Sequence, residues 1–217
     1  MFSGIVQELG QLESISKADS ILKLNIKTTR NFSNGVNIGD SIAVDGVCLT
    51  ATKVENQHLS FDAVPETLSR TIMSTYKKES KINLEKSLQY GDVIGGHLNS
   101  GHIHCVGVVK EVEIIDAAKD VLIEISNDWG KYIFEKGYIS LNGCSITLGE
   151  INVERFKVHL IPETLASTNL DLLVHGDRVN IEFDQNTITI VAVSYTHLRA
   201  HETREDRGLR GVGVKKK

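Results

Sequence analysis

One short polar motif occurs twice in the chain, as "VPETLSRTIM" beginning at Val64 and as "IPETLASTNL" beginning at Ile161. The two prolines of the sequence, Pro65 and Pro162, lie in these copies, 97 residues apart. In each copy a glutamate and then a threonine follow the proline. Proline can end a strand and open a tight helical turn. The polar groups there suit the binding of a small polar heterocycle or a sugar alcohol. The alternative interpretation is a strand terminator that serves folding alone.

The ionisable residues differ between the two copies, although the surrounding pattern is shared. At the same offset Cys48 aligns with Ser145, and Ile5 aligns with His102. Two sites that hold one kind of molecule in different chemical settings suit a reaction between two identical substrates. One molecule would lose a proton to a base while the other accepts a nucleophile. Taken alone, Cys48 is more typical of a small buried apolar residue, the commoner place of cysteine in proteins.

A metal site is not expected in the segment "GGHLNSGHIHC". His97, His102, His104 and Cys105 lie close together there, but their spacing matches no zinc pattern. The motifs "GxGxxG" and "GxxxxGK" are absent from the sequence, so binding of a nucleotide through a phosphate loop is not supported.

The repetition extends well beyond the proline motif and predicts a tandem duplication. "SIAVDGVCLT" aligns with "YISLNGCSIT", "KINLE" aligns with "RVNIE", and Ser3-Gly4 aligns with Ser100-Gly101. One constant offset serves all of these without a gap. Each unit of about 90 residues is therefore expected to be a small domain with its own core.

Each unit is expected to consist mostly of strands. Segments such as "LKLNI", "SIAVD" and "KINLE" are short, alternating and β-branched, and Gly, Asn and Asp separate them. Such a pattern indicates a small barrel or a sandwich. One stretch, "NDWGKYIFEKG", is expected to be helical, capped by Asn127 or Asp128 and ended by Gly137.

The composition is that of an ordinary soluble globular protein. Apolar residues make up 41% and charged residues 24% of the 217 residues, and the net charge is −4. This balance does not favour nucleic acid or an anionic membrane as a partner. No apolar run is long enough for a membrane span, and the N-terminus does not match a signal peptide. Three cysteines without paired spacing indicate free thiols and a cytoplasmic location.

The segments "MFSGIV", "GDSIAVDGVCLT", "GGHLNSGHIHCVG", "GCSITLGE", "VHLIPETLASTNL" and "VNIEFD" together resemble the riboflavin synthase alpha-chain family, from Met1 to about Val193. The resemblance implies an all-β fold of two tandem, similar six-stranded antiparallel Greek-key barrels with a C-terminal tail. The implied limits are 1–97 and 98–186 for the two lumazine-binding barrels and 187–217 for the C-terminal segment. It also implies a homotrimer in which each productive site lies between the first barrel of one subunit and the second barrel of its neighbour.

The implied reaction is a dismutation of two 6,7-dimethyl-8-ribityllumazine molecules without cofactor or metal. A four-carbon unit passes from one molecule to the other, giving riboflavin and 5-amino-6-ribitylamino-pyrimidinedione. His102 is the natural candidate to take a proton from the lumazine C7 methyl group, and Cys48, Ser41 or a bound water could add at C7 of the other molecule. The alternatives are a non-catalytic antenna-type protein that binds lumazine or flavin, and a structural protein built from twin barrels.

The resemblance assigns residues position by position. Those implied for turnover are Phe2, Ser41, Cys48, His102 and Asp184. The lumazine contacts implied for the first barrel are Gly4, Ile5, Val6, Cys48, Leu49, Thr50, Asp62, Ala63, Val64, Pro65, Glu66 and Thr67. Those implied for the second barrel are Gly101, His102, Ile103, Lys136, Ser145, Ile146, Thr147, Ile161, Pro162, Glu163, Thr164, Leu165 and Ala166.

The tail departs from the family, in which a helix assembling three subunits follows the second barrel. From Ser194 onward it has seven Lys or Arg against three Asp or Glu. It has few apolar residues, several glycines and no heptad seam. We expect a tail foreign to the fold rather than a basic arm for nucleic acid. The chain is therefore predicted to be largely monomeric or weakly associated.

Overall fold

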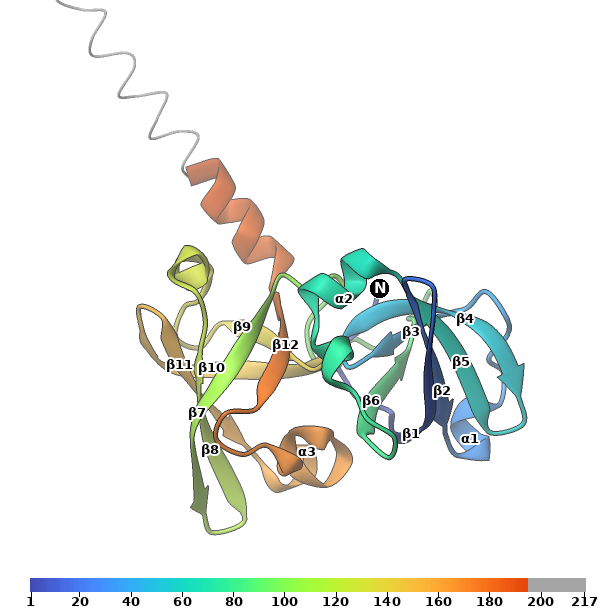
Figure 1. Ribbon diagram of the computed structural model, residues 1–217. Helices are drawn as coiled ribbons and strands as arrows, with labels where there is room; N and C mark the ends of the chain where they lie inside the picture. Colours follow the sequence, from blue (N-terminus) through green and yellow to red (C-terminus); the bar gives the residue numbers. More distant parts are fainter. Residues whose placement is uncertain (195–217) are drawn as a thin grey trace, which may run out of the picture.

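The computed structural model describes residues 1–194, which form two closed antiparallel barrels of six strands side by side (Figure 1). The expected all-β class, the duplication and the barrel architecture are confirmed. A helix over residues 185–194 follows the last strand and points away from the barrels.

The first barrel has the strand order β1-β2-β5-β4-β3-β6, and β6 closes it by pairing with β1. Three consecutive strands, β3 to β5, are followed by β6, which returns to lie beside β3, so the connection is a Greek key. Its strands are β1 Glu8–Ala18, β2 Ile21–Lys27, β3 Ser41–Val44, β4 Val47–Glu55, β5 His58–Ala63 and β6 Lys81–Lys86.

The second barrel repeats this order, and each strand begins 97 residues after its counterpart. Its strands are β7 Cys105–Ile115, β8 Ala118–Glu124, β9 Tyr138–Leu141, β10 Cys144–Asn152, β11 Arg155–Leu160 and β12 Arg178–Phe183. In β5 and β11 the buried residues alternate with more exposed ones, as a sheet with one face on a core requires. Phe61 and Phe156 are both fully buried, one in each barrel.

Short helices fill the connections, again in pairs. The first half has α1 Arg30–Ser33, α2 Pro65–Arg70 and the 3-10 helix η1 Ile72–Thr75. The second half has the 3-10 helices η2 Asn127–Tyr132 and η3 Asn169–Leu172, with α3 Pro162–Ser167 between them. Both proline motifs open a helical turn, as expected.

The helix expected over "NDWGKYIFEKG" is shorter than the sequence suggested. It is the 3-10 helix η2, which begins after Ser126 and ends before Ile133 without a side-chain cap. Trp129 and Tyr132 instead pack with Phe183 in an aromatic group on the second core. These tertiary contacts hold the turn, so Gly137 does not end a continuous helix.

The two barrels meet through their tightest turns. Gly46 and Gly143 face each other across the contact, and a Cβ on Gly46 would lie 2.7 Å from the Gly143 nitrogen. Both glycines have positive φ, and so do Asp45 and Asn142, which precede them. Two-residue hairpin turns of this kind favour the Asp-Gly and Asn-Gly pairs found here.

Buried polar side chains connect the two halves around this contact. Asp45 Oδ1 accepts hydrogen bonds from the backbone N–H of Asn83, at 2.8 Å, and from Asn169 Nδ2, also at 2.8 Å. Asn180 Nδ2 donates to the Asp45 carbonyl. Tyr76 donates its hydroxyl to Asp45 Oδ2 at 2.6 Å. Burial nevertheless raises the pKa of Asp45 to about 7.

Replacing Asp45 with asparagine, the residue at the equivalent position 142, should flatten the dependence of stability on pH. The folded-state pKa of about 7 lies above the ordinary aspartate pKa of 3.8, so the folded state disfavours ionisation. Wild-type stability should therefore fall as pH rises from about 4 to about 7 and then level off. Urea unfolding of both proteins at pH 5 and pH 8 measures this. An Asp45→Asn variant that is destabilised equally at both pH values would contradict it.

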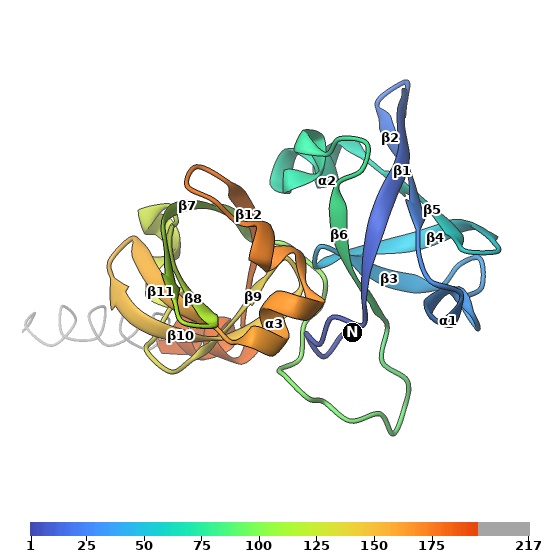
Figure 2. The ribbon, with the colours of Figure 1, turned by 90° about the horizontal axis from the view of Figure 1, so that it is seen from below.

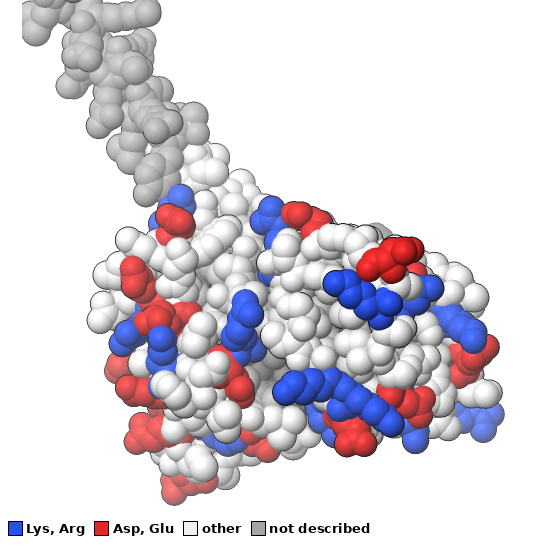
Figure 3. Space-filling model, in the orientation of Figure 1, with Lys and Arg blue, Asp and Glu red and all other residues white. Residues whose placement is uncertain are grey.

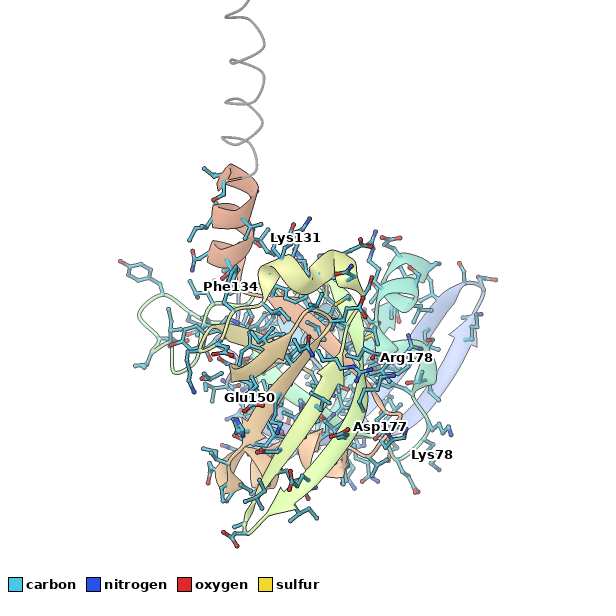
Figure 4. All side chains as sticks on the ribbon, turned by 90° about the vertical axis from the view of Figure 1, so that its left-hand side faces the viewer. Lys78, Lys131, Phe134, Glu150, Asp177 and Arg178 are labelled. Carbon is cyan, nitrogen blue, oxygen red and sulfur yellow. The ribbon has the colours of Figure 1, made fainter. Side chains whose placement is uncertain are left out.

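The helix over residues 185–194 begins with a side-chain cap. Asp184 Oδ2 accepts from the backbone N–H of Thr187 at 2.9 Å and from its hydroxyl at 3.0 Å. Phe134 is labelled near the base of this helix in Figure 4 and is 53% exposed. Ile190 and Val193, on the helix itself, are also exposed. The tail predicted to be foreign, from about Ser194, lies outside the described residues, which end at position 194.

Candidate functional site

A cavity of about 180 Å³ opens on the first barrel, and residues from both halves of the chain line it. From the first half come strand β4 and helix α2, and from the second half comes the segment that precedes β7. The lining residues are Val47, Cys48, Glu66, Thr67, Arg70, Thr71, Gly101, His102 and Ile103. We call this cavity the first pocket. Cys48 and His102, both implied for turnover, therefore line one cavity.

The N-terminal segments of the two halves are exchanged between the barrels. The Cys48 backbone N–H donates to the Gly101 carbonyl at 2.9 Å, and the Ser145 N–H donates to the Gly4 carbonyl at 2.8 Å. Ile103 packs in the first core, while Val6 packs against the second. The resemblance groups Gly4, Ile5 and Val6 with the first barrel and Gly101, His102 and Ile103 with the second, whereas each segment packs on the opposite barrel.

The path of the chain explains the exchange. After β6 the chain makes a long excursion, drawn in green in Figure 2, and returns beside the N-terminus. There Phe2 forms a bridge with Asn99, with both backbone N–H···O bonds made. The first segment joins the first barrel only at Gln7, whose N–H donates to the Leu84 carbonyl on β6. The second segment joins the second barrel only at His104, whose N–H donates to the Ile181 carbonyl on β12.

The glycines of this region are needed for close packing rather than for flexibility. A Cβ on Gly96 would lie 2.5 Å from the Ser3 carbonyl oxygen. Gly101 has φ +83°, and a Cβ there would lie 2.5 Å from the Cys48 Cβ. The short distance between segment and strand is therefore possible only with glycine.

Each recurring Ser-Gly pair is held by a buried glutamate. Glu85 Oε1 accepts from the Ser3 N–H and hydroxyl, both at 2.7 Å, and Oε2 accepts from the Gly4 N–H at 3.1 Å. Glu182 binds the second pair in the same way. Burial raises the pKa of both carboxyl groups, and the hydrogen bonds lower it by less. The site residues predicted from the sequence include neither glutamate, although the aligned segments "KINLE" and "RVNIE" both end in this residue.

The remaining residues implied for turnover lie at different distances from the first pocket. Phe2 is buried beneath Gly101, where a Cβ on the glycine would meet its ring at 2.9 Å. Ser41 is half-buried and pairs with Thr50 on β4, two residues from Cys48. Asp184 lies at the end of the second barrel, where it caps the helix. The structure thus brings Phe2, Cys48 and His102 together and leaves Asp184 apart.

A second group of polar side chains lies where the Gly4 segment meets β10. His97 Nδ1 and Ser145 Oγ are 2.6 Å apart, and the His97 ring stacks on Tyr138 at 5.4 Å. We call Gly4, His97, Tyr138 and Ser145 the second-barrel cluster. Burial lowers the pKa of His97, while the charge of Asp184 raises it by less. In the sequence, His97 stands out only as a candidate metal ligand.

The other predicted contacts fall into three groups. Leu49, Ala63 and Ile146 are buried in the barrel cores, and Leu165 packs against the second core. Glu66 and Thr67 line the first pocket, and Thr164 is half-buried on α3. The exposed ones are Thr50, Asp62, Val64, Pro65, Lys136, Thr147, Ile161, Pro162, Glu163 and Ala166.

Removing the Ser145 hydroxyl should destabilise the fold, since it leaves a buried imidazole without its one partner. Its other ring nitrogen, His97 Nε2, is already buried without a hydrogen bond to any of the residues that the structure describes. We expect Ser145→Ala to lower the free energy of unfolding by about 1–3 kcal/mol. Ser140→Ala is the matched control, because its buried hydroxyl has no hydrogen-bond partner among residues 1–194 and its loss should be nearly neutral. Equal effects in urea unfolding would contradict the pairing.

Basic and acidic side chains are mixed on the surface. Lys and Arg are interspersed with Asp and Glu over the face shown in Figure 3. Within residues 1–194, no three His, Cys, Asp or Glu side chains are placed so that they could hold a metal ion. None of the helices in that part of the chain has the length and apolar character needed to cross a membrane.

Comparison with known proteins agrees with the duplicated barrel. The family model described as "Lumazine binding domain" matches twice, over residues 3–87 and 100–184. The chain belongs to the lumazine-binding domain family.

Relatives within this family are riboflavin synthases. The enzyme of Chlamydia pneumoniae is 42% identical over 187 residues, which is 86% of this chain and 92% of the relative. That of Escherichia coli (strain K12) is 37% identical, over 93% of this chain and 95% of the relative.

Solved structures with the same fold include LumP. In complex with riboflavin it has a TM-score of 0.80 and 27% identity, covering 84% of this chain and 99% of LumP. In complex with 6,7-dimethyl-8-(1'-D-ribityl) lumazine the TM-score is 0.78, with the same identity and coverage.

Proposed function

We propose that this chain is a riboflavin synthase, a transferase that passes a four-carbon unit between two 6,7-dimethyl-8-ribityllumazine molecules. The products are riboflavin and 5-amino-6-ribitylamino-pyrimidinedione. The observation that carries the proposal is one repeated frame with two unlike sets of reactive groups. Cys48 and His102 line the first pocket, whereas Ser145 and His97 belong to the second-barrel cluster. The riboflavin synthase relatives support the same activity.

The chemistry asks for two different roles, which two unlike sites can supply. The lumazine that donates the four-carbon unit must lose a proton from its C7 methyl group, and the acceptor must be attacked at C7. His102 is exposed and lines the first pocket, which supports a role for it in moving a proton there. Cys48, Ser41 or a bound water is the proposed nucleophile. The repeated "PETL" turns would each help to hold one lumazine.

The proposed productive site lies between the first barrel of one subunit and the second barrel of its neighbour. The helix over residues 185–194 supplies one apolar surface for such an assembly, since Ile190 is 66% and Val193 is 51% exposed. The prediction that this chain associates only weakly concerns the tail rather than this helix, and it stays a prediction. Light scattering at micromolar concentration tests it, and a stable trimer would contradict it.

The activity itself is tested by incubating the purified full chain with the lumazine and following flavin absorbance. Formation of riboflavin supports the synthase. Tight binding of lumazine without flavin formation would instead support the antenna-type alternative. LumP, which shares the fold, has been solved with riboflavin and with the lumazine bound. We also propose a cytoplasmic location, consistent with three free cysteines.

A further inference from the structure

Two buried carboxylates occupy equivalent places at the ends of the last strands of the two barrels. Glu85 lies on β6 and is 2% exposed, and Glu182 lies on β12 and is 3% exposed. Each accepts three hydrogen bonds from one Ser-Gly pair. For Glu182 these are the Ser100 N–H and hydroxyl, both at 2.6 Å, and the Gly101 N–H at 3.0 Å.

The hydrogen bonds continue from the carboxylate towards the first pocket. Ser100 Oγ donates to Glu182 and accepts from the His102 N–H at 3.2 Å. The next carbonyl along, that of Gly101, accepts from the Cys48 N–H. Glu182 itself does not line the pocket. It belongs to the second barrel, yet the segment that it holds forms a wall of the first pocket.

The equivalent arrangement runs in the opposite direction. Glu85 belongs to the first barrel and binds Ser3 and Gly4, and the Ile5 N–H approaches Ser3 Oγ at 3.4 Å. The Gly4 carbonyl then accepts from the Ser145 N–H in the second-barrel cluster. The frame therefore contains two crossed connections, one from the last strand of the second barrel to β4 and one from the last strand of the first barrel to β10.

We propose that Glu182 and Glu85 are positioning residues, and that each sets the geometry of the ligand site on the opposite barrel. Glu182 holds His102 and the Gly101 carbonyl against Cys48, and Glu85 holds the Gly4 carbonyl against Ser145. The catalytic part of this inference rests on the proposed function, whereas the crossed pattern does not. Neither glutamate touches the cavity that would hold the lumazine.

A carboxylate suits this task because all three groups that face it are donors. Glutamine has nearly the same shape, but one of its two terminal atoms is a donor as well. In Glu182→Gln that NH₂ group would face either the serine donors or the Gly101 N–H. One buried donor would then lose its acceptor, and the segment would shift away from Cys48.

Amide hydrogen exchange of the full chain without ligand tests the crossed pattern. In Glu182→Gln, exchange at Cys48 should accelerate on the order of 10-fold, while Ser145 is little changed. In Glu85→Gln, hydrogen exchange at Ser145 should accelerate and that at Cys48 should change little. Acceleration confined to the same barrel as the mutation, or no acceleration in either variant, would overturn the inference. If a glutamine variant fails to fold, Ser100→Ala and Ser3→Ala form a milder pair with the same expected pattern.

Turnover of the lumazine tests positioning separately. If the wild type forms riboflavin, Glu182→Gln should lower kcat on the order of 10–100-fold with little change in KM. Ser100→Ala should act in the same direction, and the double variant should lose less than the product of the two effects. Unchanged kcat in an active background would overturn the catalytic part. A wild type that forms no riboflavin would instead refute the proposed function and leave the exchange experiment decisive.

Discussion

Replacing His102 with glutamine should lower kcat by about 10²–10⁴-fold, the usual cost of losing a group that transfers a proton. His102 is exposed at the mouth of the first pocket and is not part of either core, so the fold should persist. Steady-state flavin formation, with circular dichroism as the check on folding, measures the effect. His175→Gln is the control, because this exposed histidine lies away from the first pocket.

Cys48→Ala should likewise reduce turnover if the thiol acts in the reaction. Cys48 is half-buried and lines the first pocket. Cys105 provides the contrast, since burial raises the pKa of its thiol to about 12 and makes it unreactive. Wild-type turnover by both Cys48→Ala and His102→Gln would leave these residues only a role in binding or packing.

Gly101→Ala should cause a large loss of stability and should also destroy the first pocket. The new methyl group would lie 2.5 Å from the Cys48 Cβ and 2.9 Å from the Phe2 ring, at φ +83°. The backbone strain costs about 1–2 kcal/mol, and overpacking adds about 1–3 kcal/mol. Urea unfolding gives the sum, and lumazine binding reports on the pocket.

Gly35→Ala separates the two contributions. Gly35 has φ +80°, almost the same backbone conformation, and nothing lies within 4 Å of the place that a Cβ would take. It should show the backbone cost alone, about 1–2 kcal/mol. Equal losses in the two variants would mean that the contacts of Gly101 with Cys48 and Phe2 do not limit the fold.

Local sequence patterns predicted most of the architecture. Alternating β-branched segments, Asp-Gly and Asn-Gly turns, and one constant offset predicted two similar β domains. Every strand of the second barrel lies at that offset from its counterpart. The 3-10 helix η2 was predicted less well, because the contacts of Trp129 and Tyr132 with Phe183 decide its form. Those contacts are not local in the sequence.

The sequence by itself determined that the chain is duplicated, that its "PETL" turns recur, and that the two copies differ in their ionisable groups. These features follow from residue types and spacing alone. The tertiary structure decided that Gly101 lies against Cys48 and Gly4 against Ser145. An alignment of two repeats is equally compatible with each N-terminal segment lying on its own barrel or on the other. Only the packing of Gly46 against Gly143, and the return of the chain beside Phe2, resolve that choice.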